Sequence, residues 1–80
     1  MIVRYLALTV VDGDLNTFRG PAYPSRAECV ARLLGILRED SDQQGLNQEW
    51  VLADAAATFE KKDHYVFETT EYAVVEVEID

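Results

Sequence analysis

The chain has little of what disulfide-linked domains and many small enzymes are built from. Its 80 residues include one cysteine, one histidine, two prolines and four glycines, and seven basic residues stand against fifteen acids. A single cysteine cannot form an internal disulfide, which excludes a disulfide-stapled secreted scaffold and favours a cytoplasmic setting. The four glycines are scattered and form no phosphate-binding loop.

Long apolar runs are also lacking. The most apolar stretch, residues 1–11, is too short to span a bilayer and has neither the basic start nor the cleavage site of a signal peptide. An acidic surface is repelled by anionic lipid headgroups. We therefore expect no membrane role.

The composition is typical of one small globular domain, which we expect to span residues 1–80. Apolar residues make up 49% and charged residues 28%, which is enough apolar surface to offset chain entropy. A chain of this size buries only about 60% of its unfolded surface, so it has no room for a second core or a deep substrate cleft.

The first part of the chain predicts a β-hairpin. Residues from Ile2 to Val11 are apolar at both alternate sets of positions, the pattern of a central strand covered on both sides. Asp12 and Gly13 then form a pair favoured in two-residue turns, and Leu15 to Arg19 can return antiparallel.

A helix is predicted from about Ser25 to Glu39. Ser25 with Glu28 three residues later is a capping pattern, and apolar residues then recur at helical spacing. Residues from Ser41 to Gly45 are polar and predict a loop.

Segment 47–62 is open to two interpretations. Asn47 as a cap, Lys61 and Lys62 near the end, and a run of alanines favour a helix. The apolar residues between Val51 and Phe59 also alternate, which leaves a strand as the alternative.

Two strands are predicted at the end of the chain, Tyr65–Glu68 and Tyr72–Ile79, joined through Thr69 to Glu71. In the last strand we expect Ala73, Val75, Val77 and Ile79 to face the core, and Val74, Glu76, Glu78 and Asp80 to face outward. The whole predicts an α+β domain, an antiparallel sheet packed on one or two helices that cover one face. The candidate core residues are Leu6, Leu8, Leu33, Leu34, Leu37, Trp50, Val75 and Val77.

Motifs for chemistry are weak. Asp12, Asp14 and Asn16 are spaced like the opening of a calcium loop, but Thr17 stands at the position that needs glycine and Tyr23 at the one that needs glutamate. A hairpin turn explains these residues better.

His64 is the only histidine, and no second soft ligand lies near it in sequence, so a surface histidine at a strand start is the better interpretation. We expect Cys29 to be a small apolar residue inside the first helix. Glu76 with Glu78 lacks the cleft that glycoside hydrolysis needs. We therefore expect no enzyme, no metal and no cofactor.

The charge is distributed unevenly. Residues 1–38 carry five arginines and three acids, whereas residues 39–80 carry twelve acids and two lysines, so the halves have net charges of +2 and −10. Direct nucleic-acid binding is improbable for so acidic a chain. The arginines suit pairing with carboxylates or contact with a protein partner.

The acidic half suggests mimicry of nucleic acid. Glu76, Glu78 and Asp80 are expected about 6.6 Å apart on one strand face, which places a negative charge at about every second phosphate of a strand that advances about 3.4 Å per charge. The expected binding residues are Glu60, Asp63, Glu68, Glu71, Glu76, Glu78 and Asp80. The alternative is a solvated acidic face that only maintains solubility.

In its size, its acidity and its absence of catalytic motifs, the chain resembles phage-encoded anti-CRISPR proteins, many of which occupy the DNA-binding or PAM-reading surface of an RNA-guided complex. The resemblance covers the whole chain as a profile and rests on no motif. It implies a stoichiometric inhibitor in the bacterial host cytoplasm, with Glu68, Glu71, Glu76, Glu78 and Asp80 as the first residues to suspect. A second hypothesis is a small structural subunit that forms a homodimer through an edge strand.

Overall fold

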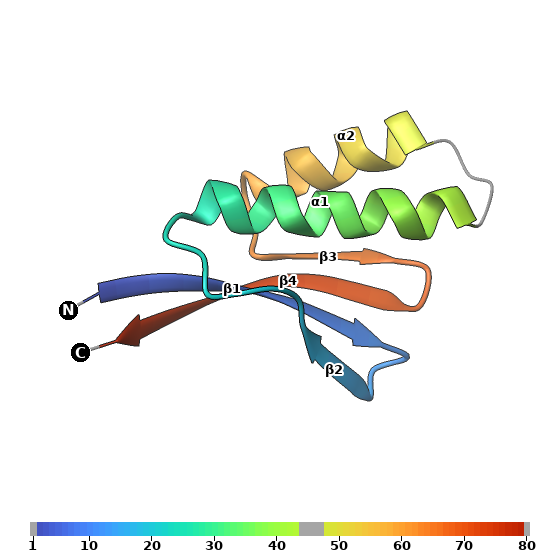
Figure 1. The fold of residues 1–80 in the computed structure, drawn as a ribbon. Helices are drawn as coiled ribbons and strands as arrows, with labels where there is room; N and C mark the ends of the chain where they lie inside the picture. Colours follow the sequence, from blue (N-terminus) through green and yellow to red (C-terminus); the bar gives the residue numbers. More distant parts are fainter. Residues whose placement is uncertain (1, 44–47, 80) are drawn as a thin grey trace.

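A four-stranded antiparallel sheet with both helices on one of its faces forms the protein (Figure 1). The computed structural model describes residues 2–43 and 48–79. In chain order the elements are β1 (Ile2–Val11), β2 (Leu15–Phe18), α1 (Arg26–Gln43), α2 (Gln48–Phe59), β3 (His64–Phe67) and β4 (Thr70–Ile79). The strand order is β2-β1-β4-β3, so the two ten-residue strands lie at the centre. The α+β prediction is confirmed.

The β1–β2 hairpin forms as predicted, with a turn one residue longer than expected. Val11 pairs with Leu15, so three residues make the turn instead of two. Asp12 and Gly13 have φ angles of 54° and 77°, the left-handed region that this pair tolerates. The amide of Asp14 donates a hydrogen bond to the carbonyl of Val11 at 3.1 Å, which closes the turn.

Helix α1 begins as predicted and ends later. The Ser25 hydroxyl accepts from the Glu28 amide at 3.3 Å and donates to the Glu28 carboxylate at 2.9 Å. The predicted loop from Ser41 is wrong up to Gln43, because Ser41 is fully buried and its hydroxyl bonds back to the Arg38 carbonyl at 3.1 Å. The rest of that loop lies outside the described residues.

Segment 47–62 contains a helix, and the strand alternative is wrong. Val51, Ala55 and Phe59 are buried on one side of α2, at the four-residue spacing of a helix face. The predicted cap Asn47 lies outside the described residues. Helix α2 ends before the two lysines, whose amides close the turn on the Thr58 carbonyl at 3.0 and 2.8 Å.

The last two strands are shifted slightly from their predicted bounds. The connection is a turn at Glu68 and Thr69, and β4 begins at Thr70. Glu68 has a φ angle of 55°. The Thr69 carbonyl accepts from the Asp12 amide at 2.8 Å, so the two hairpin turns lie side by side and fix this end of the sheet.

The predicted facing of β4 is wrong. Tyr72 and Val74 are buried on the side of the helices, and a strand places every second residue on the same face. Glu76 and Glu78 therefore lie on the helix side of the sheet, and Ala73, Val75, Val77 and Ile79 lie on the other. The prediction failed because both sets begin with apolar residues, and the carboxylates occupy the part of the helix side that no helix covers.

The buried core lies between the helices and the sheet. It consists of Ala7, Cys29, Leu33, Ile36, Leu37, Val51, Ala55, Phe59, Tyr65, Phe67, Tyr72 and Val74. Leu33 and Leu37 are confirmed as core residues, and Leu34 packs half-buried against the core. The prediction that Trp50 lies in the core is wrong, because its side chain is 66% exposed. Its neighbour Val51 faces the core, and adjacent helix positions point about 100° apart.

The face of the sheet opposite the helices is apolar and has no layer over it among the described residues (Figure 1). We call it the open face. Paired residues of neighbouring strands share a face, so the registers assign to it Ile2, Leu6, Leu8, Val10, Ala73, Val75, Val77 and Ile79 of β1 and β4, with Phe18 of β2 and Val66 of β3. Leu6, Leu8, Val75 and Val77, expected in the core, are half-buried here.

Gly35 offers a direct test of helix α1. It lies exposed in the middle of the helix, and a Cβ atom added there would meet nothing within 4 Å. We expect Gly35→Ala to raise the free energy of unfolding by about 0.5 to 1 kcal/mol, because alanine loses less backbone entropy on folding.

Chemical denaturation of both proteins measures this difference. Gly13→Ala is the matched control: space is also open there, but the positive φ angle of 77° opposes a side chain, so that variant is expected to lose stability. Loss of stability in Gly35→Ala would contradict the described path of α1.

Candidate functional site

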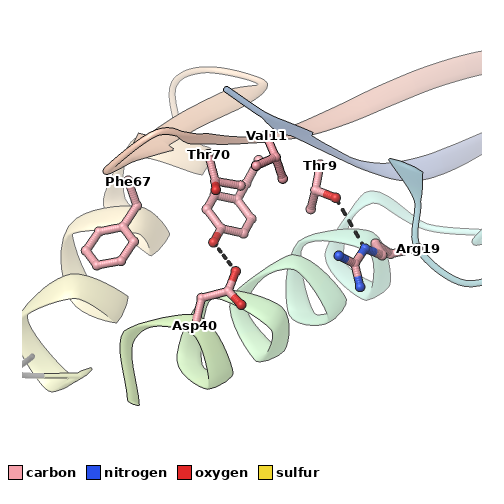
Figure 2. A pocket seen from close by; sticks show the side chains of 7 residues that line it. Thr9, Val11, Arg19, Asp40, Phe67 and Thr70 are labelled. Atoms are coloured by element: carbon pink, nitrogen blue, oxygen red, sulfur yellow. Dashed lines mark hydrogen bonds between the residues drawn. The ribbon is translucent and has the colours of Figure 1, made fainter. Parts of the chain in front are cut away.

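A polar pocket of about 220 Å³ opens between the sheet and the end of α1 (Figure 2). Its lining residues come from β1, β3, β4, α1 and the segment after β2: Thr9, Val11, Arg19, Asp40, Phe67, Thr70 and Tyr72. Five of these seven side chains are polar or charged, which makes the pocket a candidate for chemistry.

The polar groups of this pocket bind one another. The Tyr72 hydroxyl donates to the Asp40 carboxylate, and Arg19 Nε donates to the Thr9 hydroxyl at 3.2 Å (Figure 2). Burial, followed by the hydrogen bond to Asp40 and its negative charge, raises the pKa of Tyr72, and the positive charge of Arg19 opposes this. Tyr72 is therefore a neutral hydrogen-bond donor that joins β4 to α1, which is a structural role.

The second helix is joined to the sheet in the same way. The Tyr65 hydroxyl of β3 donates to the Asp54 carboxylate of α2 at 2.9 Å. Burial, the hydrogen bond and the charge of Asp54 raise the pKa of Tyr65 to about 12. Each helix thus has one aspartate that holds a tyrosine of the sheet in its protonated form.

Cys29 and His64, the groups considered for nucleophilic catalysis, lie in α1 and at the start of β3. Cys29 is fully buried in α1, where burial raises the pKa of its thiol despite the nearby charge of Arg26, so it has little thiolate character. His64 is exposed at the start of β3, as predicted. Within residues 2–43 and 48–79, no three side chains of histidine, cysteine, aspartate or glutamate converge as metal ligands.

The structure brings together part of the predicted carboxylate set. The Val74 amide donates to the Asp63 carbonyl at 2.7 Å, so Asp63 stands opposite Val74, two residues from Glu76 and four from Glu78 on the same side of the sheet. We call Asp63, Glu76 and Glu78 the acidic edge. All three side chains are exposed.

An arginine of helix α1 pairs with one end of the acidic edge. Arg26 forms an ion pair with Asp63 at 3.1 Å and donates to the Lys62 carbonyl at 2.9 Å. Glu60 lines the same shallow groove as Arg26. One positive charge thus offsets part of this end of the edge, and Glu76 and Glu78 form the part farthest from it.

Other predicted carboxylates lie elsewhere. Glu68 is in the β3–β4 turn, at the opposite end of β4 from Glu76 and Glu78. Glu71 pairs with Val10 and therefore lies on the open face. Asp80 lies outside the described residues. A continuous row of all seven carboxylates does not form.

Among the residues that the structure describes, the backbone beside the acidic edge has no strand partner on one side. Strand β3 covers β4 only from Thr70 to Ala73. Because the Val74 amide points toward β3, the amides and carbonyls of Glu76 and Glu78 point the same way, past the end of β3. Carboxylates and free backbone groups thus occupy the same strand end.

The open face is the feature that sequence reasoning missed. Its signal was present, because β1 is apolar on both sides, and this was interpreted as a strand buried on both sides. In the described part of the chain, only one of these sides is covered.

Comparison with protein-family models, with curated proteins and with solved structures found no match to this chain. No helix in the described part of the chain is long and apolar enough to cross a membrane. The surface and its charges therefore carry the functional argument.

Proposed function

We propose that this protein is a non-catalytic inhibitor that binds the basic nucleic-acid-binding surface of a bacterial RNA-guided complex through the acidic edge. It acts in the host cytoplasm, stoichiometrically and without a cofactor, as the resemblance to anti-CRISPR proteins implies. The observation that carries the proposal is the pair of exposed carboxylates, Glu76 and Glu78, on one face of a projecting strand end.

Position and spacing both suit a groove that normally holds phosphates. The ends of β1 and β4 that carry the termini extend past the helices (Figure 1), so Glu76 and Glu78 can enter a groove without the helix layer colliding with its walls. Glu76 and Glu78 lie about 6.6 Å apart along β4, about two phosphate steps of a nucleic-acid strand. The free backbone beside them adds hydrogen-bond donors and acceptors for the same partner.

The net charge of the protein supports fast association with such a partner. At −8, the chain is attracted over long range to a strongly basic groove, which raises the association rate at low salt. The same charge repels nucleic acid. We therefore expect binding to the nucleic-acid-free complex and competition with DNA.

The edge strands of the sheet are β2 and β3, and the end of β4 beyond β3 offers a further edge. Pairing of two copies through this end of β4, one form of the edge-strand homodimer, is less favourable. Antiparallel pairing of this segment with its own copy sets glutamates of one strand against those of the other, and like charges directly opposite are destabilising. Charged side chains on an exposed edge also discourage pairing with another sheet. A basic partner relieves this repulsion.

The test is a pull-down of the tagged protein from bacterial lysate that contains RNA-guided complexes, followed by a DNA-binding assay with the purified complex. We expect the recovered complex to be released by added DNA and by high salt. We expect Glu76→Lys/Glu78→Lys to abolish the inhibition of DNA binding, because it reverses the charges that meet the groove.

The matched control is Glu39→Lys/Asp42→Lys, which changes the net charge equally at two exposed residues of α1. Inhibition that survives in the control and is lost in the β4 variant supports the proposal. Equal loss of inhibition in both variants would show that the effect depends on the overall charge and not on the acidic edge. Unchanged inhibition in the β4 variant would disprove mimicry by this edge.

A further inference from the structure

The open face is a large apolar surface that no other element within residues 2–43 and 48–79 covers. Four side chains at its periphery are strongly exposed: Ile2 at 48%, Phe18 at 56%, Val66 at 59% and Ile79 at 45%. The helices lie on the opposite side of the sheet (Figure 1). Exposed apolar patches of this kind mark interaction sites in small proteins.

Its size approaches what a stable interface needs. Two ten-residue strands at about 3.3 Å per residue, flanked by two four-residue strands at about 4.8 Å spacing, give a flat footprint of about 450 Å². The relief of the side chains adds to this area. A standard interface buries about 600 to 1,000 Å² on each partner, so the open face supplies most of one side.

The charge of the open face differs from that of the rest of the protein. Among the described strand residues, its charged side chains are one arginine, Arg4, and one glutamate, Glu71. The face is therefore neutral, with His64 as its other titratable group, although the protein as a whole carries −8. A basic partner has little reason to bind here, whereas a neutral apolar face avoids most of the repulsion between two acidic copies.

The two charges lie where a twofold axis pairs them. Arg4 is opposite Val77 near one end of the face, and Glu71 is opposite Val10 near the other. A twofold axis across the strands at the middle of the face reverses the strand direction, so Arg4 of each copy approaches Glu71 of the other. The central apolar residues Leu6 and Val75 then lie between the two sheets.

The geometry points to a second copy of this chain as the occupant: the open faces of two molecules pack together as a β-sandwich with reversed strands. This covers both sides of β1, as its apolar pattern requires. The helices and the acidic edge remain on the outside, because they lie on the other side of each sheet. The dimer is compatible with the proposed function and independent of it.

The test is sedimentation equilibrium at protein concentrations from low to high micromolar. We expect a monomer–dimer equilibrium that persists at high salt, unlike binding by the acidic edge. Val75→Glu, at the centre of the face, is expected to abolish the dimer. Leu15→Glu is the matched control, because Leu15 is 62% exposed and pairs with Val11 on the other side of the sheet; it is expected to leave the dimer intact.

A charge exchange keeps the test independent of any folding defect in Val75→Glu. Arg4→Glu or Glu71→Arg alone is expected to weaken dimerisation at least about tenfold. Each substitution brings like charges together at both of the two contacts that the twofold axis relates. The double variant is expected to restore it. A monomer at all concentrations, or a dimer unaffected by Val75→Glu in a folded variant, overturns the inference. A dimer in which the double variant stays weak overturns the reversed-strand arrangement.

Discussion

Replacement of Phe59 by alanine is expected to lower the free energy of unfolding by about 3 to 5 kcal/mol. The side chain is 1% exposed at the end of α2, and removal of a buried phenylalanine costs about 3 to 5 kcal/mol. A domain of this length has about 4 to 12 kcal/mol in total. The single substitution therefore removes a large share of the stability.

Phe59 contributes this much to stability because it attaches the end of α2 to the sheet. Its ring lies 6.5 Å from that of Tyr65, centre to centre, and this contact joins the last turn of α2 to β3. Val51 and Ala55 complete the buried side of the helix, and both are smaller.

Urea denaturation followed by circular dichroism measures the loss. Phe18→Ala is the matched control, because Phe18 is 56% exposed and a surface substitution changes stability by about 0.5 kcal/mol or less. Dilute protein keeps any self-association out of the comparison. A loss below about 1 kcal/mol for Phe59→Ala would mean that α2 does not pack on the sheet as described.

The elements of this fold follow from local patterns in the sequence. The Asp12–Gly13 pair, the Ser25–Glu28 cap and the apolar stripe of α1 each have a local cause, and each forms near its predicted place. The end of α1 was missed because Ser41 is polar by composition but buried by packing. A local pattern does not show that its hydroxyl is satisfied within the helix.

The faces of the sheet could not be predicted in the same way. Residues 72–75 are apolar on both sides of β4, and the glutamates at alternate positions near its end appeared to mark the solvent side along the whole strand. The helix layer covers only part of the strand (Figure 1), so Tyr72 is buried and Glu78 is exposed on one face. The length of the cover is a tertiary property.

The candidate site was predictable only where neighbours in sequence stay neighbours in space. Glu76 and Glu78 lie together as expected, and Asp63 joins them through the pairing of β3 with β4. Glu71 has the opposite parity from Glu76 along β4 and therefore lies on the other face. A count of acids in the C-terminal half contains no such information.

High pH is expected to destabilise the folded protein through Tyr65 and Tyr72. Burial and the neighbouring aspartates raise both pKa values above the ordinary 10.0, that of Tyr65 to about 12. Above pH 10 the unfolded chain releases these protons while the folded chain keeps them, so the unfolded state binds fewer protons and stability falls as pH rises. The stabilising contribution is complete below pH 10 and is lost progressively toward pH 12 and above.

The expected loss between pH 10 and 12 is about 2 kcal/mol for Tyr65, since one pKa unit corresponds to about 1.4 kcal/mol, and Tyr72 adds a loss in the same direction. Denaturant unfolding at a series of pH values measures it. Tyr65→Phe/Tyr72→Phe is expected to be less stable at neutral pH, by about 1 to 2 kcal/mol for each lost hydrogen bond to a carboxylate, and to lose most of the pH dependence. Other groups that titrate in this range are the same in both proteins. An equally steep fall in the double variant would show that these two hydroxyls do not hold the helices to the sheet in the way described.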